Sequence, residues 1–288
     1  MRLSLSKAIG WSVAFMLLGI GASAMLVSLW ALITVGNVLR GVTSLSSPGP
    51  SQVVVIGMSQ LLGFAFATWA VGFRALRLRR ADLRWVAPRS GAPGLAIGLI
   101  LGAVTAGVAL LSAVVLGNSH WSRDAGGVGE YVVQVVKTAF VLAPAALSEE
   151  VMFRGIPLVL LAAVVGRGTA LVVVAGLVFA LFHGLNPGVT ALGLGNIALA
   201  GIFLGVAFYA PGGLWTAFGA HLGWNATLAA LDAPVSGLPF RIPFIDYRAG
   251  DPAWLSGGPF GPEGGLLATA AITAALLVAL RWTGKDSA

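Results

Sequence analysis

The feature that most constrains this chain is a series of apolar runs, several of which reach the roughly 20 residues needed to cross a bilayer. Only 9% of the 288 residues are charged and 58% are hydrophobic, whereas ordinary globular chains carry about 25% charged residues. The runs do not alternate between apolar and polar residues, as the strands of a membrane β-barrel would. The sequence therefore predicts an all-α, polytopic membrane protein.

Breaks rich in proline and glycine divide the apolar runs and predict about eight transmembrane helices. The segment 156–165 is too short to cross a bilayer alone, so we expect it to be half of a broken or re-entrant helix. The first apolar stretch continues to about Leu39, which is too long for a cleaved signal peptide and indicates an uncleaved first span. The expected helices are 8–39, 51–78, 93–116, 130–153, 156–165, 168–184, 189–210, 213–231 and 264–282.

The basic residues indicate the orientation of the chain in the membrane. Six arginines lie between two apolar runs, and such clusters mark the cytoplasmic side and contact anionic lipids. We therefore expect a multi-pass protein of the cell membrane with a cytoplasmic N-terminus and no nucleic-acid partner. The absence of cysteine excludes disulfides, thiolate metal sites and a cysteine nucleophile. The clustered arginines are Arg74, Arg77, Arg79, Arg80, Arg84 and Arg89.

Two adjacent glutamates, Glu149 and Glu150, lie inside one of the most apolar stretches of the chain. A carboxylate surrounded by hydrocarbon is costly unless it has a partner or a chemical role. Arg154 follows Glu150 by four residues, so on a helix the two side chains share a face and can pair. Glu149 is rotated by about 100° from Glu150 and can face a different cavity. Glu149 is therefore the candidate reactive group, and an ion-pair staple between helices is the alternative.

Two of the three histidines lie within or at the end of apolar runs. His183 ends the run that contains Phe179, and His221 precedes Asn225 by four residues. His221 and Asn225 would face the same way on a helix and could present two hydrogen-bond donors to an oxyanion. Glu149 with His183 could orient and deprotonate a water. Alternatively, Glu149, His183 and His221 could hold zinc, whose catalytic sites use three protein ligands and an open position.

The order of these residues resembles the motif set of the CPBP intramembrane protease family. That family includes the CAAX prenyl protease 2 type enzymes, the lysostaphin-resistance A-like proteins and the bacteriocin self-immunity (Abi) proteins. The resemblance covers about 130–231, and the other helices match only in being membrane segments. The matching motifs are Glu149-Glu150-Val-Met-Phe-Arg154-Gly, Phe179-x-x-x-His183 and His221-x-x-x-Asn225.

The resemblance implies an endopeptidase whose site lies within the bilayer. If the family's roles apply at the matching positions, Glu149 and His183 would activate the water, while His221 and Asn225 would stabilise the tetrahedral oxyanion. Glu150 and Arg154 would support the site. The family is commonly called metalloprotease, and a metal-independent glutamate mechanism is also argued for it, so zinc stays open. The implied substrate is a membrane-associated protein or peptide. The motifs alone do not imply that this chain processes prenylated CAAX proteins.

The chain is expected to have three parts. Residues 1–129 form the N-terminal transmembrane helices and the cytoplasmic basic loop, 130–231 form the catalytic helices, and 232–288 form an extramembrane loop and a final transmembrane helix. The loop, about 232–265, is expected to be either a lid over the site or a passive linker. Its aromatic residues are expected to anchor it at the membrane interface; they are Phe240, Phe244, Tyr247 and Trp254.

Two functions of other classes remain as alternatives to a peptidase. Intramembrane Glu, His and Arg also build proton relays, so a proton-coupled transporter is one, although no inverted repeat is visible. A non-catalytic, immunity-like membrane binding protein is the other. It would keep its partner after Glu149, His183 and His221 are replaced, whereas a peptidase would lose activity. The sequence gives no indication of the oligomeric state.

Overall fold

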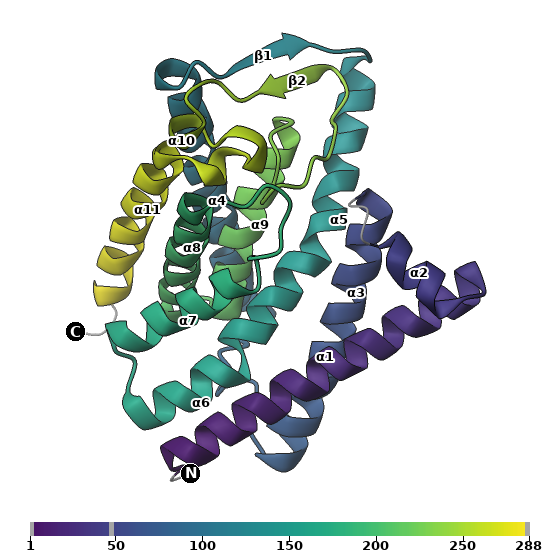
Figure 1. Ribbon diagram of the computed structural model, residues 1–288. Helices are drawn as coiled ribbons and strands as arrows, with labels where there is room; N and C mark the ends of the chain where they lie inside the picture. Colours follow the sequence, from purple (N-terminus) through teal and green to yellow (C-terminus); the bar gives the residue numbers. More distant parts are fainter. Residues whose placement is uncertain (1–2, 46–48, 286–288) are drawn as a thin grey trace.

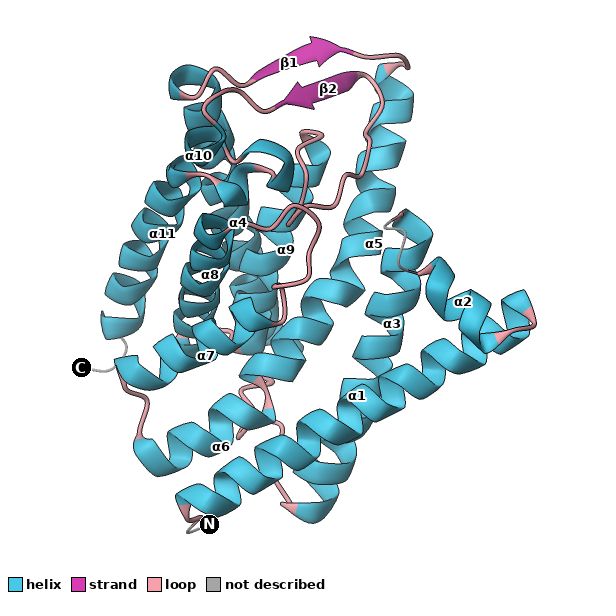
Figure 2. Cartoon of the chain, viewed as in Figure 1, coloured by secondary structure: helices cyan, strands magenta, loops and turns pink. Residues whose placement is uncertain are grey.

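The computed structural model describes residues 3–45 and 49–285 as a helical bundle with a small two-stranded sheet at one end (Figure 1). Figure 2 shows the two strands lying across that end, above the helices. The longer helices are α1 (Leu5–Val35), α3 (Pro50–Ala67), α4 (Pro88–Leu116), α5 (Val128–Arg154), α8 (Ala191–Tyr209), α9 (Leu214–Ala230) and α11 (Leu266–Lys285). The shorter ones are α2 (Val38–Ser44), α6 (Ile156–Val165), α7 (Thr169–Leu181) and α10 (Ala253–Ser256), and the strands are β1 (His120–Arg123) and β2 (Ile245–Arg248).

The chain is an all-α multi-pass membrane protein, as its composition predicts. Within the described residues, six helices are long and apolar enough to cross a membrane. Large apolar side chains on their outer faces are exposed, including Leu17, Val115 and Phe140, as expected for surfaces that meet lipid. The other two expected spans are α7 and α9, with 13 and 17 residues. At 1.5 Å per residue, α7 is about 20 Å long, less than the roughly 30 Å of a hydrocarbon core.

The first expected helix, 8–39, is two helices in the structure. Gly36 ends α1 in the left-handed region, at φ 70°, and its N–H donates to the Leu32 carbonyl. The Asn37 side chain then accepts a hydrogen bond from the Arg40 N–H at 2.9 Å and begins α2. Glycine adopts this conformation without steric cost and asparagine is a preferred N-cap, so local chemistry interrupts a continuous apolar run.

The segment after α9 is packed against the bundle, which differs from the expected interface loop. Phe240 and Tyr247 are 5% and 7% exposed, and they belong to a buried cluster that also contains Leu142 and Leu228. The prediction that these two aromatic residues anchor the loop at the membrane interface is therefore wrong. They are buried because β2 pairs with β1 and brings the loop back over the ends of α5 and α9 (Figure 1).

Close packing between α4 and α9 fixes the position of the helix that carries His221. A Cβ on Gly102 of α4 would overlap the Ala220 carbonyl of α9, and one on Gly219 of α9 would overlap the Leu95 carbonyl of α4. Small residues let membrane helices approach to backbone contact. These glycines therefore set the depth at which His221 enters the bundle.

Candidate active site

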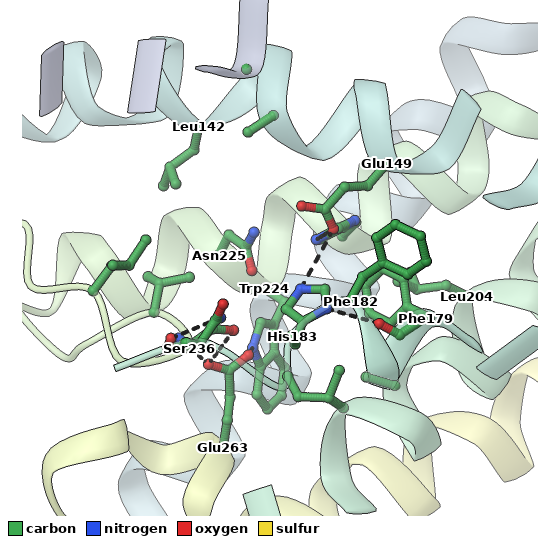
Figure 3. Close-up of a pocket in the computed structure, with 18 of the residues that line it drawn as sticks. Leu142, Glu149, Phe179, Phe182, His183, Leu204, Trp224, Asn225, Ser236 and Glu263 are labelled. Carbon is green, nitrogen blue, oxygen red and sulfur yellow. Dashed lines mark hydrogen bonds and ion pairs between the residues drawn. The ribbon is translucent and has the colours of Figure 1, made fainter. Parts of the chain in front are cut away.

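The predicted site residues line one cavity of about 310 Å³ inside the bundle (Figure 3). Glu149 comes from α5, His183 from the turn that follows α7, and His221 and Asn225 from α9. The remaining wall is largely apolar and includes residues of all three predicted parts of the chain, such as Gln60, Thr105 and Glu263. The short helix α7 ends at Leu181, and the turn that follows it brings His183 next to Glu149.

Glu150 and Arg154 form a fully buried ion pair one turn apart on α5. Arg154 Nη1 donates to Glu150 Oε1 at 3.1 Å, and both side chains are 0% exposed. Arg154 Nη2 also donates to the Gly201 carbonyl of α8 at 2.9 Å, and its guanidinium lies over the ring of Phe179 at 4.6 Å. The pairing expected from the i, i+4 spacing is present, and the arginine additionally joins α5 to α7 and α8.

Glu149 faces the two histidines rather than the arginine. Its Oε2 atom lies 3.7 Å from His183 Nε2 and 3.8 Å from His221 Nε2. Both separations are longer than a hydrogen bond, and this buried oxygen has no hydrogen-bond partner among the described residues. The sequence predicts different roles for the two glutamates. In the structure, Glu150 pairs with Arg154, whereas Glu149 faces the two histidines.

Hydrogen bonds at Nδ1 orient both imidazole rings towards Glu149. His183 Nδ1 lies 2.9 Å from the Phe179 carbonyl oxygen, which only accepts, so Nδ1 carries the proton and Nε2 of the neutral ring is an acceptor. This contact gives the Phe-x-x-x-His spacing a physical basis. His221 Nδ1 lies 2.8 Å from Glu150 Oε1. This contact was not predictable from the motifs, because 71 residues separate the two side chains.

Asn225 lies one turn beyond His221 on α9 and lines the same cavity. Figure 3 shows its amide between Glu149 and Ser236. The expected common face of His221 and Asn225 is present, since both residues line the cavity that Glu149 enters.

A metal site does not form from the described residues. No three His, Asp or Glu side chains of this part of the chain are grouped so that they could hold a metal ion. Glu149, His183 and His221 converge, but in this arrangement they do not fit a zinc ion as a ligand set.

A second carboxylate in the cavity, Glu263, was expected in a loop and was not among the predicted site residues. Glu263 is 5% exposed and lies across the cavity from Glu149 (Figure 3). Its Oε1 accepts from Trp224 Nε1 at 3.1 Å, and its Oε2 accepts from Ser236 Oγ at 3.0 Å and from the Ser236 N–H. Asn196 holds the adjoining backbone by donating to the Glu263 carbonyl at 2.8 Å. Glu263 thus fastens the returning loop to α9 beside Asn225.

The buried Glu263 gives the fold a specific pH dependence. Burial raises the pKa of its carboxyl above the ordinary 4.5, against hydrogen bonds from Ser236 and Trp224 that lower it. Between pH 4.5 and the folded-state pKa, the folded protein holds a proton that the unfolded chain has released. The stability from this group is therefore complete below pH 4.5 and is lost as pH rises through the folded-state pKa.

Glu263→Gln should remove this dependence, because the amide does not titrate. We expect the unfolding temperature, followed by tryptophan fluorescence in detergent, to fall less in the variant than in the wild type as pH rises above 4.5. Glu130→Gln, at the exposed start of α5, is the control and should follow the wild type. Parallel profiles for wild type and Glu263→Gln would contradict the assignment.

A comparison with known protein families gives a match to part of the chain. Residues 130–227 match the family model described as type II CAAX prenyl endopeptidase Rce1-like. The predicted family resemblance is confirmed over this segment. The Rce1-like segment contains all the motif residues from Glu149 to Asn225, whereas Glu263 lies outside it. No curated protein and no solved structure matches the chain. At the level of the family, the match supports an intramembrane endopeptidase of the CAAX protease type.

Proposed function

We propose that the protein is an intramembrane endopeptidase that hydrolyses a peptide bond of a membrane-associated protein or peptide. The observation that carries the proposal is the convergence of Glu149 Oε2 on the Nε2 atoms of His183 and His221, at 3.7 and 3.8 Å, in the cavity of the bundle. Separations of this size suit one small polar molecule held between three groups. A water there would meet a carboxylate that has no other hydrogen-bond partner among the described residues.

In the proposed reaction, Glu149 takes a proton from the water while His183 Nε2 accepts its second hydrogen bond. The water oxygen attacks the peptide carbonyl carbon and the negative charge moves to the carbonyl oxygen. Glu149 then gives the proton to the leaving nitrogen as the C–N bond breaks, which yields a carboxylic acid and an amine. A positioned acid–base group contributes about 10²–10⁴-fold to such a step.

His221 and Asn225 are proposed to stabilise the oxyanion. Asn225 donates through its amide. The Nδ1–H of His221 is directed at Glu150, so His221 can donate from Nε2 only when the ring is doubly protonated. Glu150 and Arg154 act through His221 by holding its ring in place.

The test of the proposed function is a comparison of membrane-protein termini in cells that carry the wild type and cells that carry Glu149→Gln. New termini that appear only with the wild type identify the substrate and the cleaved bond together. A transporter would instead show solute or ion flux in liposomes without cleavage, and a binding protein would keep its partner in the variant. Identical termini in both strains would reject the peptidase.

Whether a metal ion takes part in the reaction is tested separately on the purified protein. Elemental analysis with chelator inhibition that zinc reverses would establish a metal enzyme and would require the ligands to rearrange from the described geometry. Full activity in a metal-free preparation would establish the glutamate mechanism.

We propose that the protein lies in the cell membrane, with its N-terminus and the arginine-rich loop between α3 and α4 (the arginine loop) in the cytoplasm. The chain has no cysteine, so a single introduced cysteine shows on which side of the membrane its residue lies, without labelling of any native thiol. Ala81→Cys, in the arginine loop, should react with a membrane-impermeant maleimide only after cells are permeabilised. Ala125→Cys, between α4 and α5 at the other end of the bundle, should react in intact cells. The reverse pattern would invert the orientation.

A further inference from the structure

A second cavity, of about 680 Å³, lies at the end of the bundle that carries the arginine loop. Its walls come from Leu3 just before α1, the loop that follows α3 and the π-helix Thr68–Ala75, the later part of α6 and the end of α8. It shares no lining residue with the candidate active site. Its volume falls within the range of ligand pockets, about 300–1,000 Å³.

The charged residues that line this second cavity are mostly arginines. Arg77, Arg79, Arg84 and Arg167 line it together with one acidic residue, Asp82, so the lining carries a net charge of +3 (four minus one). Asp82 is already paired with Arg79, at 3.0 Å between Oδ1 and Nη2. Among the described lining residues, no carboxylate remains for the other three arginines.

Arg84 and Arg167 are held near one another in spite of their like charge. Arg84 donates to the carbonyls that end α8, to Phe208 at 2.8 Å and to Tyr209 and Ala210 at 3.0 Å. Arg167 lies over the ring of Tyr209 at 5.4 Å, and Arg84 lies over the same ring at 5.8 Å. Burial lowers the pKa of Arg84, and the nearby charge of Arg167 lowers it further. The fold therefore keeps two repelling guanidiniums at one wall of the cavity.

The hydroxyl of Tyr209 adds an unused donor beside these arginines. It is buried and has no hydrogen-bond partner among the described residues, although a buried hydroxyl normally has one. Apolar side chains, including Leu3, Val159 and Phe208, complete the wall. A compact anion with several acceptor oxygens would satisfy both the hydroxyl and the arginines.

We propose that this cavity binds a phosphate group, read by Arg77, Arg167 and the Tyr209 hydroxyl. Arginine forms strong, often paired, hydrogen bonds to phosphate oxygens, and Arg77 and Arg167 are exposed and free of any carboxylate partner among the described residues. The cavity lies where membrane-spanning helices end, which is the depth of lipid headgroups, and basic pockets between such helices bind anionic headgroups. A lipid phosphate and a free phosphate present the same chemistry to these three groups.

The test uses the full-length protein in neutral detergent, with unfolding followed by its tryptophan fluorescence. Three probes are titrated: dioctanoyl phosphatidylglycerol, dioctanoyl phosphatidylcholine as the lipid without net charge, and inorganic pyrophosphate. We expect phosphatidylglycerol or pyrophosphate to raise the unfolding temperature of the wild type in a saturable manner, and phosphatidylcholine to have no such effect.

Three variants locate the site. In Arg77→Gln/Arg167→Gln we expect the apparent dissociation constant to rise about tenfold or more, because hydrogen bonds to charged groups are lost. Tyr209→Phe changes no charge and should weaken binding about fivefold through the lost hydroxyl. Arg80→Gln, an exposed arginine of the same loop that does not line the cavity, should match the wild type.

The pattern of responses identifies the source or overturns the site. A response to phosphatidylglycerol alone assigns a lipid headgroup, and a response to pyrophosphate alone assigns a soluble phosphate. If neither probe stabilises the protein, or if Arg80→Gln weakens binding as much as the double variant, the proposal is wrong. The second result would show attraction by the whole basic loop instead of a site.

Discussion

Replacing Glu149 by glutamine is expected to lower kcat by about 10²–10⁴-fold while the fold survives, because the amide cannot take the proton of the attacking water. The change is nearly isosteric, and Glu149 Oε2 has no hydrogen bond in the described structure that the amide would lose. Cleavage of a membrane-associated peptide by purified protein, with a substrate found from the cellular comparison, measures the loss. The unfolding temperature of the variant should stay close to that of the wild type.

A matched substitution separates chemistry from stability. Glu130→Gln makes the same change on the same helix, at an exposed cap outside the cavity, and should leave turnover unchanged. Asn225→Ala should cost about 10²–10³-fold in kcat with little change in KM, the loss typical of one oxyanion donor. Unchanged turnover in Glu149→Gln would reject its role in activating the water.

Replacing Arg154 by methionine is expected to be the most destabilising single change considered, at about 3–5 kcal/mol. It would leave the Glu150 carboxylate buried without its cation and remove the donor to the Gly201 carbonyl. Denaturant unfolding in detergent, followed by tryptophan fluorescence, measures the loss. Arg80→Met, on the exposed loop, is the control for the loss of an arginine.

A second variant keeps this prediction testable if Arg154→Met does not accumulate. Glu150→Gln/Arg154→Met removes both charges, and neutral replacements of a buried pair are often tolerated. The double variant should therefore recover more than half of the lost stability and yet remain impaired in kcat. The glutamine oxygen can still accept from His221 Nδ1–H, but it lacks the negative charge that favours the doubly protonated ring. A double variant as unstable as the single one would show that the buried charge is not the cause.

Local spacing along the chain is enough to predict several contacts of this site without its tertiary structure. The pairing of Glu150 with Arg154 and the common face of His221 and Asn225 follow from the geometry of a helix turn. The all-α membrane fold follows from the apolar runs, because only internally hydrogen-bonded helices or closed barrels satisfy the backbone within a bilayer. Gly36 and Asn37 are typical residues for the end of one helix and the start of the next. The expected helix 8–39 nevertheless crossed this break, because the apolar residues continue through it.

Contacts between distant residues were not predictable in this way. His221 meets Glu150, and Glu263 meets Trp224 and Ser236, across helices and loops whose packing no local pattern describes. The two strands escaped prediction because β1 and β2 are four residues each and pair across more than 120 positions. The three-part division of the chain remains a prediction, although the cavity draws its lining from all three parts.

By itself, the sequence determined that this chain crosses the membrane as helices, which residues are candidates for the chemistry and which family its motifs resemble. Composition and spacing along a helix are local properties, and local geometry is enough to interpret them. Only the tertiary structure decided that Glu149 faces both histidines, that Glu150 holds His221, and that an arginine-lined cavity lies apart from the site. Those arrangements depend on how the turn after α7 meets α5 and how closely α4 approaches α9, and both result from packing between separate segments of the chain.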